Sequence, residues 1–509
     1  MDSTPPISSF APAPARPFAR LAPWALALGL IFYAWLLARH SGAYAGGADS
    51  SGYLNHARLL AAGQVKVPPR PLPQLAPEHA PPYLLVPLGF KPAPDPRHLV
   101  PTYPTGLPLL LAAVAPVTGW ELAPHVLAVL HGVLGVLLAY LAARAFGLSC
   151  RWGWVAAIIV GGSPLYLNMA LQTLSDVPAL VWTTAAVLAA WHSIQGDRRW
   201  ALAAGFAFAL AVLVRPTNLL ALVPIACALG FDWRRWALFV VAGAPGGAFF
   251  LLHTHAAYGK YLTTGYGDSA GLEWALVPRT LAHYVRWLPV LFTPVVIGIF
   301  ALPWLGRTAR RAALVLGAWL LVFAGFYSAY YNTHETWWYL RFLLPAIVAA
   351  VVGGLLGFRA VLARVMTPLR ARIAWLLALV FAVGNGWHFS TQLHAFGPGD
   401  GEKIYPLTAQ WLRERLPANA VVAVMQHSGA VYYYTDFTIV RWDQMTAEEF
   451  VHVRAAIQAS GRPLYAALFP FEVEEQKALA ERMPGRWTEI GSVRDTRVWQ
   501  FDFSTPSAP

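Results

Sequence analysis

Two acidic residues and two arginines stand where long apolar segments are interrupted by short polar turns. Asp49 follows the small residues of GGADSSGY, and Asp176 lies in LSDVP. Arg215 lies in VRPTN, and Arg341 lies in WWYLRFLLP. A carboxylate can accept the proton of a hydroxyl group, and a planar guanidinium can bind a phosphate through two hydrogen bonds. The four residues are therefore candidates for a site that handles a hydroxyl and a phosphate.

Each of these residues also has an ordinary structural explanation. Asp176 stands just before Val-Pro, so it can cap the N-terminus of a helix, and Asp49 can be a plain loop residue. Arg215 and Arg341 can reach toward lipid headgroups, and Arg341 can pair with Glu335. Because an arginine close to lipid is costly unless it is paired or functional, the sequence leaves both explanations open.

Two tyrosines lie near these turns. Tyr53 begins a moderately amphipathic segment, 53–63, for which we predict a helix along the membrane surface. Tyr103 lies in PTYPTGLP, whose prolines and glycine predict a shaped turn that leads into the membrane.

Metal ligands are harder to find. His253 and His255 have the spacing of two ligands, but no acid stands at a diagnostic interval from them. Cys150 and Cys227 predict neither a disulfide framework nor a zinc site. We therefore assign no metal ligand and no cofactor, and a divalent metal ion is left as an open alternative.

Composition places the chain in a membrane. Of the 509 residues, 57% are hydrophobic and only 12% are charged, whereas soluble domains carry about 25% charged residues. The net charge of +12 does not indicate nucleic acid, because arginine gathers in the cytoplasmic loops of membrane proteins. We predict no nucleic-acid partner.

Apolar runs long enough to span a bilayer recur along the chain. They cover 21–39, 123–143, 153–172, 177–194, 200–214, 217–231, 236–253, 285–305, 312–331, 339–358 and 373–391. The run 107–117 is too short and too proline-rich to span comfortably, and excluding it places the arginine-rich loops on one side, which the positive-inside rule makes cytoplasmic. We predict a mainly α, polytopic membrane protein with about 11 transmembrane helices, its N-terminus inside and its C-terminus outside.

The remaining segments complete the expected organisation. Residues 1–20 are rich in proline, alanine and serine and predict a disordered cytoplasmic N-terminus. The transmembrane domain covers 21–395 and includes a long first outer loop at 40–105. Residues 396–509 predict a small α/β domain on the non-cytoplasmic side, with strands at 420–426, 430–441, 463–468 and 497–503 and helices at 409–416 and 447–458.

The order of these segments resembles the GT-C superfamily of membrane glycosyltransferases, especially the group with protein O-mannosyltransferases and lipid A aminoarabinose transferases. The resemblance rests on Asp49 with Tyr53, Ala57 and Gly63, then on YPTGLPLLLA, SDVPA, LVRPTNLL, YGKYLTTGYG and WWYLRFLLPA. It covers about residues 20–390. Related transferases often show Asp-Glu or Glu-Lys-Pro-Pro in the first loop, whereas Ser50 follows Asp49 here, so the resemblance does not specify the donor sugar.

The resemblance implies a GT-C fold, an active site on the non-cytoplasmic face and a polyprenyl-phosphate sugar donor. It implies that Asp49 acts at the reaction centre and that Asp176 is a second catalytic residue. Because an acceptor hydroxyl is a poor nucleophile, a carboxylate base near it helps, and Asp49 is the expected base. The substrate-binding candidates are Tyr53, Tyr103, Arg215 and Arg341.

The expected partners are the lipid-linked donor, a protein, lipid or glycan acceptor, and membrane lipids, and the expected location is a bacterial inner membrane. A glycan ligase or polymerase, a lipid-linked sugar transporter and a non-enzymatic scaffold are the alternatives. The transporter is disfavoured because the charged candidates lie at the outer ends of the spans and not near their middle.

Overall fold

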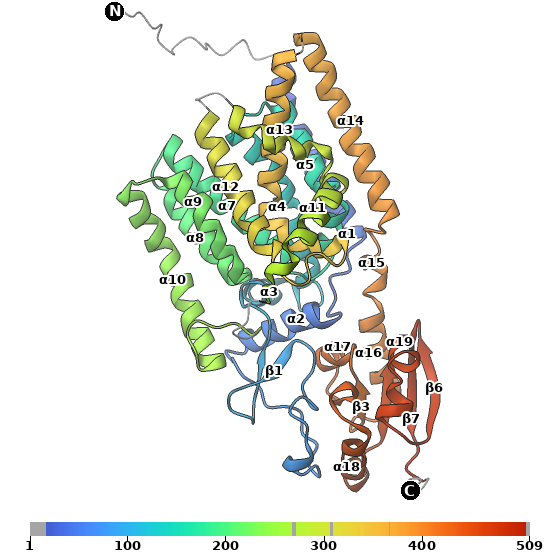
Figure 1. The fold of residues 1–509 in the computed structure, drawn as a ribbon. Coiled ribbons are helices and arrows are strands. Elements are labelled where there is room, and N and C mark those ends of the chain that lie inside the picture. Colours follow the sequence, from blue (N-terminus) through green and yellow to red (C-terminus); the bar gives the residue numbers. More distant parts are fainter. Residues whose placement is uncertain (1–16, 267–270, 306–308, 366, 505–509) are drawn as a thin grey trace, which may run out of the picture.

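The computed structural model describes residues 17–504 except 267–270, 306–308 and 366. Helices form a large bundle, and a smaller part with a β-sheet lies at one end of it (Figure 1). Most of the segment predicted to be disordered, 1–16, lies outside the described residues, while 17–20 belong to the first helix and not to a disordered tail.

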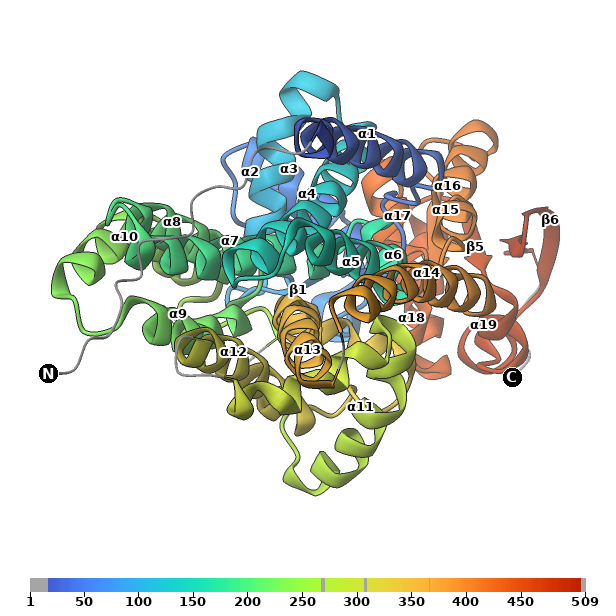
Figure 2. The ribbon, with the colours of Figure 1, turned by 90° about the horizontal axis from the view of Figure 1, so that it is seen from above.

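Long apolar sequences form the bundle. Its helices are α1 (Pro17–Arg39), α4 (Ala123–Ala145), α5 (Cys150–Gly161), α6 (Pro164–Ala170), α7 (Asp176–Gln195), α8 (Trp200–Val214), η2 (Pro216–Ala221), α9 (Leu222–Leu229), α10 (Trp233–Tyr258), α11 (Val277–Phe292), η4 (Pro294–Trp304), α12 (Arg310–Ser328), η6 (Trp337–Leu343), α13 (Leu344–Val365) and α14 (Pro368–Gln392). Seen from above, α7 and α13 lie inside the bundle, while α10 and α14 lie at its edge (Figure 2). Burial agrees, because 78% of the apolar window of α7 is buried but only 17% of those of α10 and α14. An apolar helix that leaves so much of its surface uncovered needs lipid around it.

Each predicted apolar run coincides with a helix or a bent pair of helices, but the count of eleven spans is not confirmed. Among the described residues, six helices are long and apolar enough to cross a membrane, and two bent pairs raise the number to eight. The pair α5–α6 bends by 64° and the pair α11–η4 by 109°. The predicted run 285–305 is therefore folded back on itself and is not one straight span.

The arginine-rich loops lie close to one another at one end of the bundle. Asp232 pairs with Arg198 at 3.3 Å and with Arg235 at 3.6 Å. Arg311 donates to the carbonyl of Ala228, and Arg359 donates to that of Gly147. Arg364 donates to the carbonyl of Trp304, which links the last two of these loops. Together the contacts connect five loops that the sequence assigns to one side, as the positive-inside pattern requires.

The opposite end carries short elements between the bundle and the sheet. Helix α2 (Ala48–Ala61) packs between α3 (Gly106–Thr118) and the C-terminal part. We expected a surface helix at 53–63, but α2 begins earlier and most of its side chains are buried, so protein covers both of its faces. Helix α3 spans about 20 Å at about 1.5 Å per residue, less than the about 30 Å of a hydrocarbon core. The strands β1 (Phe90–Pro92) and β2 (Leu99–Pro101) form an antiparallel ribbon, and β2 packs against α2 and α10.

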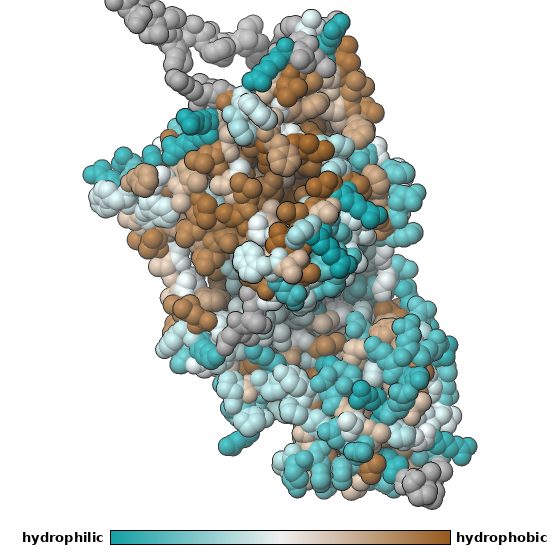
Figure 3. Space-filling view, viewed as in Figure 1, coloured by the Kyte–Doolittle hydropathy of each residue, from teal (hydrophilic) through white to brown (hydrophobic). Residues whose placement is uncertain are grey.

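The C-terminal part is a five-stranded sheet flanked by helices. Its elements are α15 (Pro398–Gly401), α16 (Ile404–Arg415), β3 (Val421–Val424), α17 (Ser428–Tyr434), β4 (Thr438–Arg441), α18 (Ala447–Ala459), β5 (Leu464–Leu468), α19 (Pro470–Glu474), β6 (Trp487–Val493) and β7 (Thr496–Phe501). The strand order is β4-β3-β5-β7-β6, with β4, β3 and β5 parallel and the last two antiparallel. In the space-filling view the hydrophobic surface covers the bundle and the hydrophilic surface covers this part (Figure 3).

Two details of the predicted tail are wrong. The strand expected at 430–441 is split, because 428–434 form helix α17 and only 438–441 form a strand. Aromatic and β-branched residues favour a strand locally, but Val431 and Tyr433 are buried within a helix that packs against α2, and this packing overrides the local preference. Strand β6 was not predicted from the sequence. It is an edge strand, and its largely exposed residues show no clear alternation of buried and exposed side chains.

Candidate functional site

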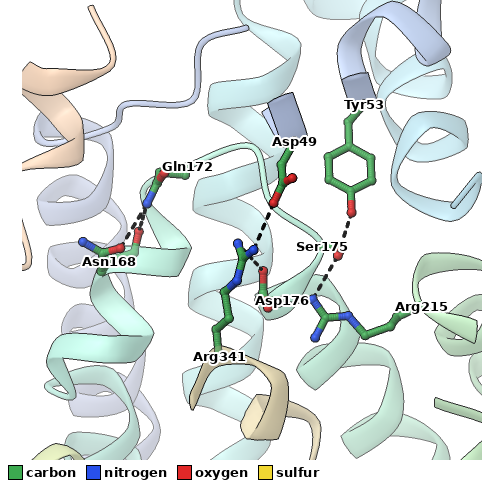
Figure 4. A network of polar contacts seen from close by, with 8 residues as sticks. All are labelled: Asp49, Tyr53, Asn168, Gln172, Ser175, Asp176, Arg215 and Arg341. Carbon is green, nitrogen blue, oxygen red and sulfur yellow. Dashed lines mark hydrogen bonds and ion pairs between the residues drawn. The ribbon is translucent and has the colours of Figure 1, made fainter. Parts of the chain in front are cut away.

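The four charged candidates meet where α2, α7, the turn after α8 and η6 come together (Figure 4). Arg341 donates to Asp49 at 3.1 Å and lies 3.8 Å from Asp176. Arg215 donates to Asp176 at 2.6 Å. Two carboxylates and two guanidiniums thus alternate in one cluster, although the sequence separates them widely.

Asp49 occupies the first turn of α2, where small residues let the chain bend sharply. Gly47 precedes the helix with φ of 45°, a backbone region open to glycine. A side chain on Gly46 would overlap Glu402 of the C-terminal part. The small residues therefore allow close packing around Asp49, whose own side chain remains 33% exposed.

Asp176 occupies the first turn of α7 and is almost completely enclosed. Its side chain is 2% exposed, against 33% for Asp49. The capping explanation is not supported, because the N-cap residue is Ser175 and no side chain caps this helix. Both carboxylate oxygens of Asp176 instead face arginines, so Asp176 anchors the two guanidiniums.

Arg215 lies in the break between α8 and η2. Pro216 ends the helix, because the residue before a proline is driven into an extended conformation, and Arg215 has φ of −151°. The side chain is 13% exposed, and its Nη1 is buried without a hydrogen-bond partner among the described residues. A buried donor of this kind is costly unless a ligand satisfies it.

Arg341 lies in η6 and does not pair with Glu335, one of the alternatives left open by the sequence. Its partners are the two carboxylates, and its guanidinium also lies over the rings of Trp338 and Phe342, 5.0 Å and 5.3 Å from the ring centroids. Because the side chain is only 13% exposed, it does not extend toward headgroups either.

Ser175 belongs to the site and was missed by sequence reasoning. Its hydroxyl accepts a hydrogen bond from Tyr53 at 2.9 Å and another from Arg215 at 3.2 Å. Because the polar residues before Pro178 fit a helix cap, the sequence did not predict that Ser175 contacts Tyr53 and Arg215. Nearby, Gln172 donates to the backbone and side-chain oxygens of Asn168, which closes the turn that leads to Ser175 (Figure 4).

The two tyrosine candidates lie side by side next to Asp49. The ring centroids of Tyr53 and Tyr103 are 5.1 Å apart, and a Cβ on Gly52 would overlap the Tyr103 ring. Burial, and then the Asp49 carboxylate, raise the pKa of both hydroxyls. Both tyrosines are therefore protonated at neutral pH and can donate hydrogen bonds.

The two histidines considered as metal ligands point to different neighbours. His253 faces His56, with 3.4 Å between their Nε2 atoms, whereas His255 stacks on Tyr261. Burial, and then His253, lower the pKa of His56 to about 3, so its ring is neutral. Within the described ranges, no group of three or more histidine, cysteine or acidic side chains could hold an ion. We therefore derive no step through a metal.

Comparisons with known proteins bear on the fold and on the class of enzyme. Residues 104–257 match the family model of dolichyl-phosphate-mannose-protein mannosyltransferase. ArnT from Cupriavidus metallidurans in the apo state is similar over 94% of this chain and 98% of its own, with a TM-score of 0.56 at 15% identity. The chain has the GT-C glycosyltransferase fold.

Further solved structures agree with the GT-C fold. ArnT bound to undecaprenyl phosphate gives a TM-score of 0.54 at 14% identity over 95% of this chain and 99% of its own. The oligosaccharyltransferase AglB from Archaeoglobus fulgidus, in complex with an inhibitory peptide and a dolichol-phosphate, gives 0.51 at 12% identity over 90% and 71%. The search for curated proteins of similar sequence returned no match.

These findings confirm the predicted resemblance to the GT-C superfamily, and with it a multi-pass membrane glycosyltransferase as the class of enzyme. The roles of Asp49, Asp176, Tyr53, Tyr103, Arg215 and Arg341 stay predictions.

Proposed function

We propose that this GT-C protein transfers a sugar from a polyprenyl phosphate to an acceptor hydroxyl on the non-cytoplasmic face of a bacterial inner membrane. The observation that supports this most is the charge cluster of Asp49, Arg341, Asp176 and Arg215 at the polar end of the bundle. A lipid-linked donor can bring its phosphate there while its chain stays in the bilayer. ArnT, of similar fold, has been solved with undecaprenyl phosphate bound.

The arginines are the phosphate-binding residues in this proposal. Arg215 Nη1 and Arg341 Nε are buried and have no hydrogen-bond partner among the described residues. A phosphate oxygen satisfies such donors, and a guanidinium can offer two parallel hydrogen bonds to it. Asp176 was expected to be catalytic, but its side chain is only 2% exposed and is paired with both arginines. In this proposal it is therefore a positioning residue that holds the two guanidiniums and does not touch the substrate.

Asp49 is the base. It is the more accessible carboxylate, and Arg341 holds it at 3.1 Å. The donor phosphate competes for Arg341 and frees the Asp49 carboxylate to accept the proton of the acceptor hydroxyl. The bond from the anomeric carbon to the phosphate oxygen then breaks, and a bond from that carbon to the acceptor oxygen forms.

Charge balance favours this assignment. Two carboxylates and two guanidiniums give the cluster zero net charge before reaction. The leaving phosphate gains one negative charge as its bond breaks. Asp49 becomes neutral when it takes the proton, so the cluster gains one positive charge at the same moment. Stabilisation of charge that develops in the transition state is a major source of catalysis.

A transfer assay tests the proposal. Membranes with the chain, and matched membranes without it, receive a panel of undecaprenyl-phosphate-linked radiolabelled sugars. We expect label in the lipid, glycan or protein fraction for one donor, and only when the chain is present. Equal labelling of both membranes with every donor would contradict this function.

A further inference from the structure

The connection between α1 and α2 lies against the C-terminal part of the chain. It ends with Gly46 and Gly47, and Asp49 follows this pair of glycines by only two residues. In Figure 1 the helices α16, α17 and α19 lie at the end of the C-terminal part that is nearest the bundle. The proposed base therefore stands at the boundary between the bundle and a polar domain whose role the charge cluster does not explain.

Local structure alone fixes the position of Asp49 weakly. Glycine has more backbone freedom than any other residue and loses more conformational entropy when it is ordered. Gly47 is the N-cap of α2, and no side chain caps this helix. Within the first turn, the amide of Ser51 donates to the carbonyl of Gly46 at 3.1 Å. A position that is accurate enough for catalysis thus depends on contacts from other elements.

The start of α16 supplies the first of these contacts. A Cβ on Gly46 would overlap both the carboxyl group of Glu402 and the ring of Tyr405, so both side chains lie directly against the Gly46 backbone. Tyr405 is 7% exposed, and its hydroxyl accepts a hydrogen bond from Gln426 Nε2 at 3.1 Å. The same hydroxyl and the Gln426 amide are the nearest groups to a Cβ placed on Gly47. The two glycines are therefore enclosed by the C-terminal part.

Helix α17 supplies contacts on both sides of Asp49 in the sequence. The amide of Ala45 donates to the hydroxyl of Tyr434 at 3.0 Å. The side-chain amide of Asn55 donates to the carbonyl of Gly429 at 3.1 Å. The C-terminal part thus holds the chain before the base and the helix after it.

Glu402 is the titratable group in direct contact with this connection. Burial raises the pKa of its carboxyl group to about 7. The carboxyl group is therefore neutral below about pH 7 and negatively charged above it. Because an enclosed charge is costly without a partner, ionisation of Glu402 should weaken its contact with Gly46.

The neighbouring charged and titratable groups are paired or neutral near pH 7. These groups are Asp400 of α15, Lys403 and Tyr405 at the start of α16, His427 after β3, and Glu472 of α19. Asp400 pairs with Lys403 at 3.8 Å, and Glu472 accepts hydrogen bonds from two backbone amides. Burial raises the pKa of Tyr405 to about 12 and lowers that of His427 to about 3. On the α1–α2 connection, Tyr44 lies against His125 instead.

We propose that Glu402 is a positioning residue, through which the C-terminal part holds Asp49 where it can accept the proton of the acceptor hydroxyl. The proposal rests on the proposed function, because it concerns the base of that reaction. Glu402 touches the backbone before Asp49 and not the substrate.

Loss of this contact should affect turnover more than donor binding. A base must lie within about 2.6–3.2 Å of the group whose proton it takes, and a misplacement of about 1 Å can cost about 10²-fold in rate. Arg215 and Arg341, the proposed phosphate contacts, belong to the bundle. A loosened connection should therefore lower kcat and leave the KM for the donor nearly unchanged.

The first test needs no transfer. Hydrogen–deuterium exchange of the purified full chain is measured by mass spectrometry in peptides that cover residues 42–55, at about pH 6 and about pH 8, on either side of the pKa of Glu402. Wild type, Glu402→Gln and Glu402→Ala are compared with one another at the same pH. Glutamine keeps the shape of the neutral carboxyl group and does not ionise, whereas alanine removes the contact.

We expect wild type and Glu402→Gln to exchange equally at about pH 6, and wild type to exchange several-fold faster than Glu402→Gln at about pH 8. Glu402→Ala should exchange faster than wild type already at about pH 6. Glu414→Gln is the matched control, because Glu414 lies on the exposed face of the same helix and pairs with Arg415. This control should exchange like wild type at both pH values.

The second test measures transfer. The kcat of wild type should fall as the pH rises through about 7, while Glu402→Gln should keep its kcat over the same range. Glu402→Ala should lose about 10–10²-fold in kcat already at about pH 6, with a nearly unchanged KM for the donor. A merely structural role would not make glutamine superior to the native residue at high pH only.

Equal exchange of wild type and Glu402→Gln at about pH 8, wild-type exchange in Glu402→Ala, or the same loss of kcat at high pH in wild type and Glu402→Gln would overturn the proposal. Should Glu402→Ala fail to fold, the comparison of wild type with Glu402→Gln decides. If the exchange results are as expected but wild type transfers no sugar, Glu402 still positions the connection and the transferase function fails. If wild type transfers sugar but exchange is the same in every variant, the function stands and the positioning role fails.

Discussion

The contrast between Asp49→Asn and Asp176→Asn tests the division of roles in the charge cluster. Asparagine keeps the size and polarity of aspartate but accepts no proton. Asp49 is 33% exposed and has one arginine partner, which also lies near Asp176. Asp49→Asn should therefore cost about 1 kcal/mol of stability or less, while transfer falls about 10²–10⁴-fold through loss of the base.

Asp176→Asn should mainly lower stability, whereas Asp49→Asn should mainly lower transfer. Its side chain is 2% exposed and lies 2.6 Å from Arg215 and 3.8 Å from Arg341. Removal of this charge leaves two enclosed guanidiniums to share one carboxylate. Breaking a buried ion pair costs about 3–5 kcal/mol, so this variant should lose much of its thermal stability. It should also lose activity, because Arg215 and Arg341 are no longer held in position.

Both properties can be measured on the same preparations. Thermal stability is followed by the fraction of detergent-solubilised chain that stays monodisperse after heating, and turnover by transfer from the labelled donor at equal protein level. Asp95→Asn is the control, because Asp95 is a half-exposed acid of the same outer loop whose contacts are local: it pairs with His98 and accepts a hydrogen bond from the backbone of Arg97. Near-normal transfer by Asp49→Asn, or equal destabilisation by Asp49→Asn and Asp176→Asn, would refute the reasoning.

Three further predictions concern other parts of the chain. Arg215→Met should raise the KM for the donor and lower turnover, because it removes a phosphate contact; an unchanged KM in initial-rate measurements would remove Arg215 from the donor site. Cysteines placed at Arg234 and Arg310 should react with an impermeant thiol reagent only after the membrane is breached, whereas one placed after residue 396 should react in intact cells, and the reverse pattern would invert the topology. Burial raises the pKa of Glu402 to about 7 from an ordinary value of 4.5, so the stability that this carboxyl contributes is present below about pH 4.5 and is lost as the pH rises through about 7. Glu402→Gln should flatten that part of the plot of stability against pH, while Glu414→Gln on the exposed face of α16 should not. An unchanged slope in Glu402→Gln would contradict this prediction.

Local patterns determined the class of protein and the ends of its main elements. Apolar runs must be covered by lipid or protein, so each predicted run became a helix or a bent pair. Arginines are excluded from the hydrocarbon core and concentrate in the loops of one side, so the arginine-rich loops lie at one end of the helical bundle. Prolines and glycines marked the breaks, and these breaks hold Asp49, Asp176, Arg215 and Tyr103.

Only the tertiary structure decided how those residues pair. The sequence could not distinguish Asp176 as a helix cap from Asp176 as the anchor of two arginines, because the partner Arg341 comes from η6, far along the chain. For the same reason Ser175 was hidden. Long-range burial also turned the strand-like residues of α17 into a helix that packs on α2. Pairing and burial depend on which distant segments meet, and no local spacing of residues encodes that.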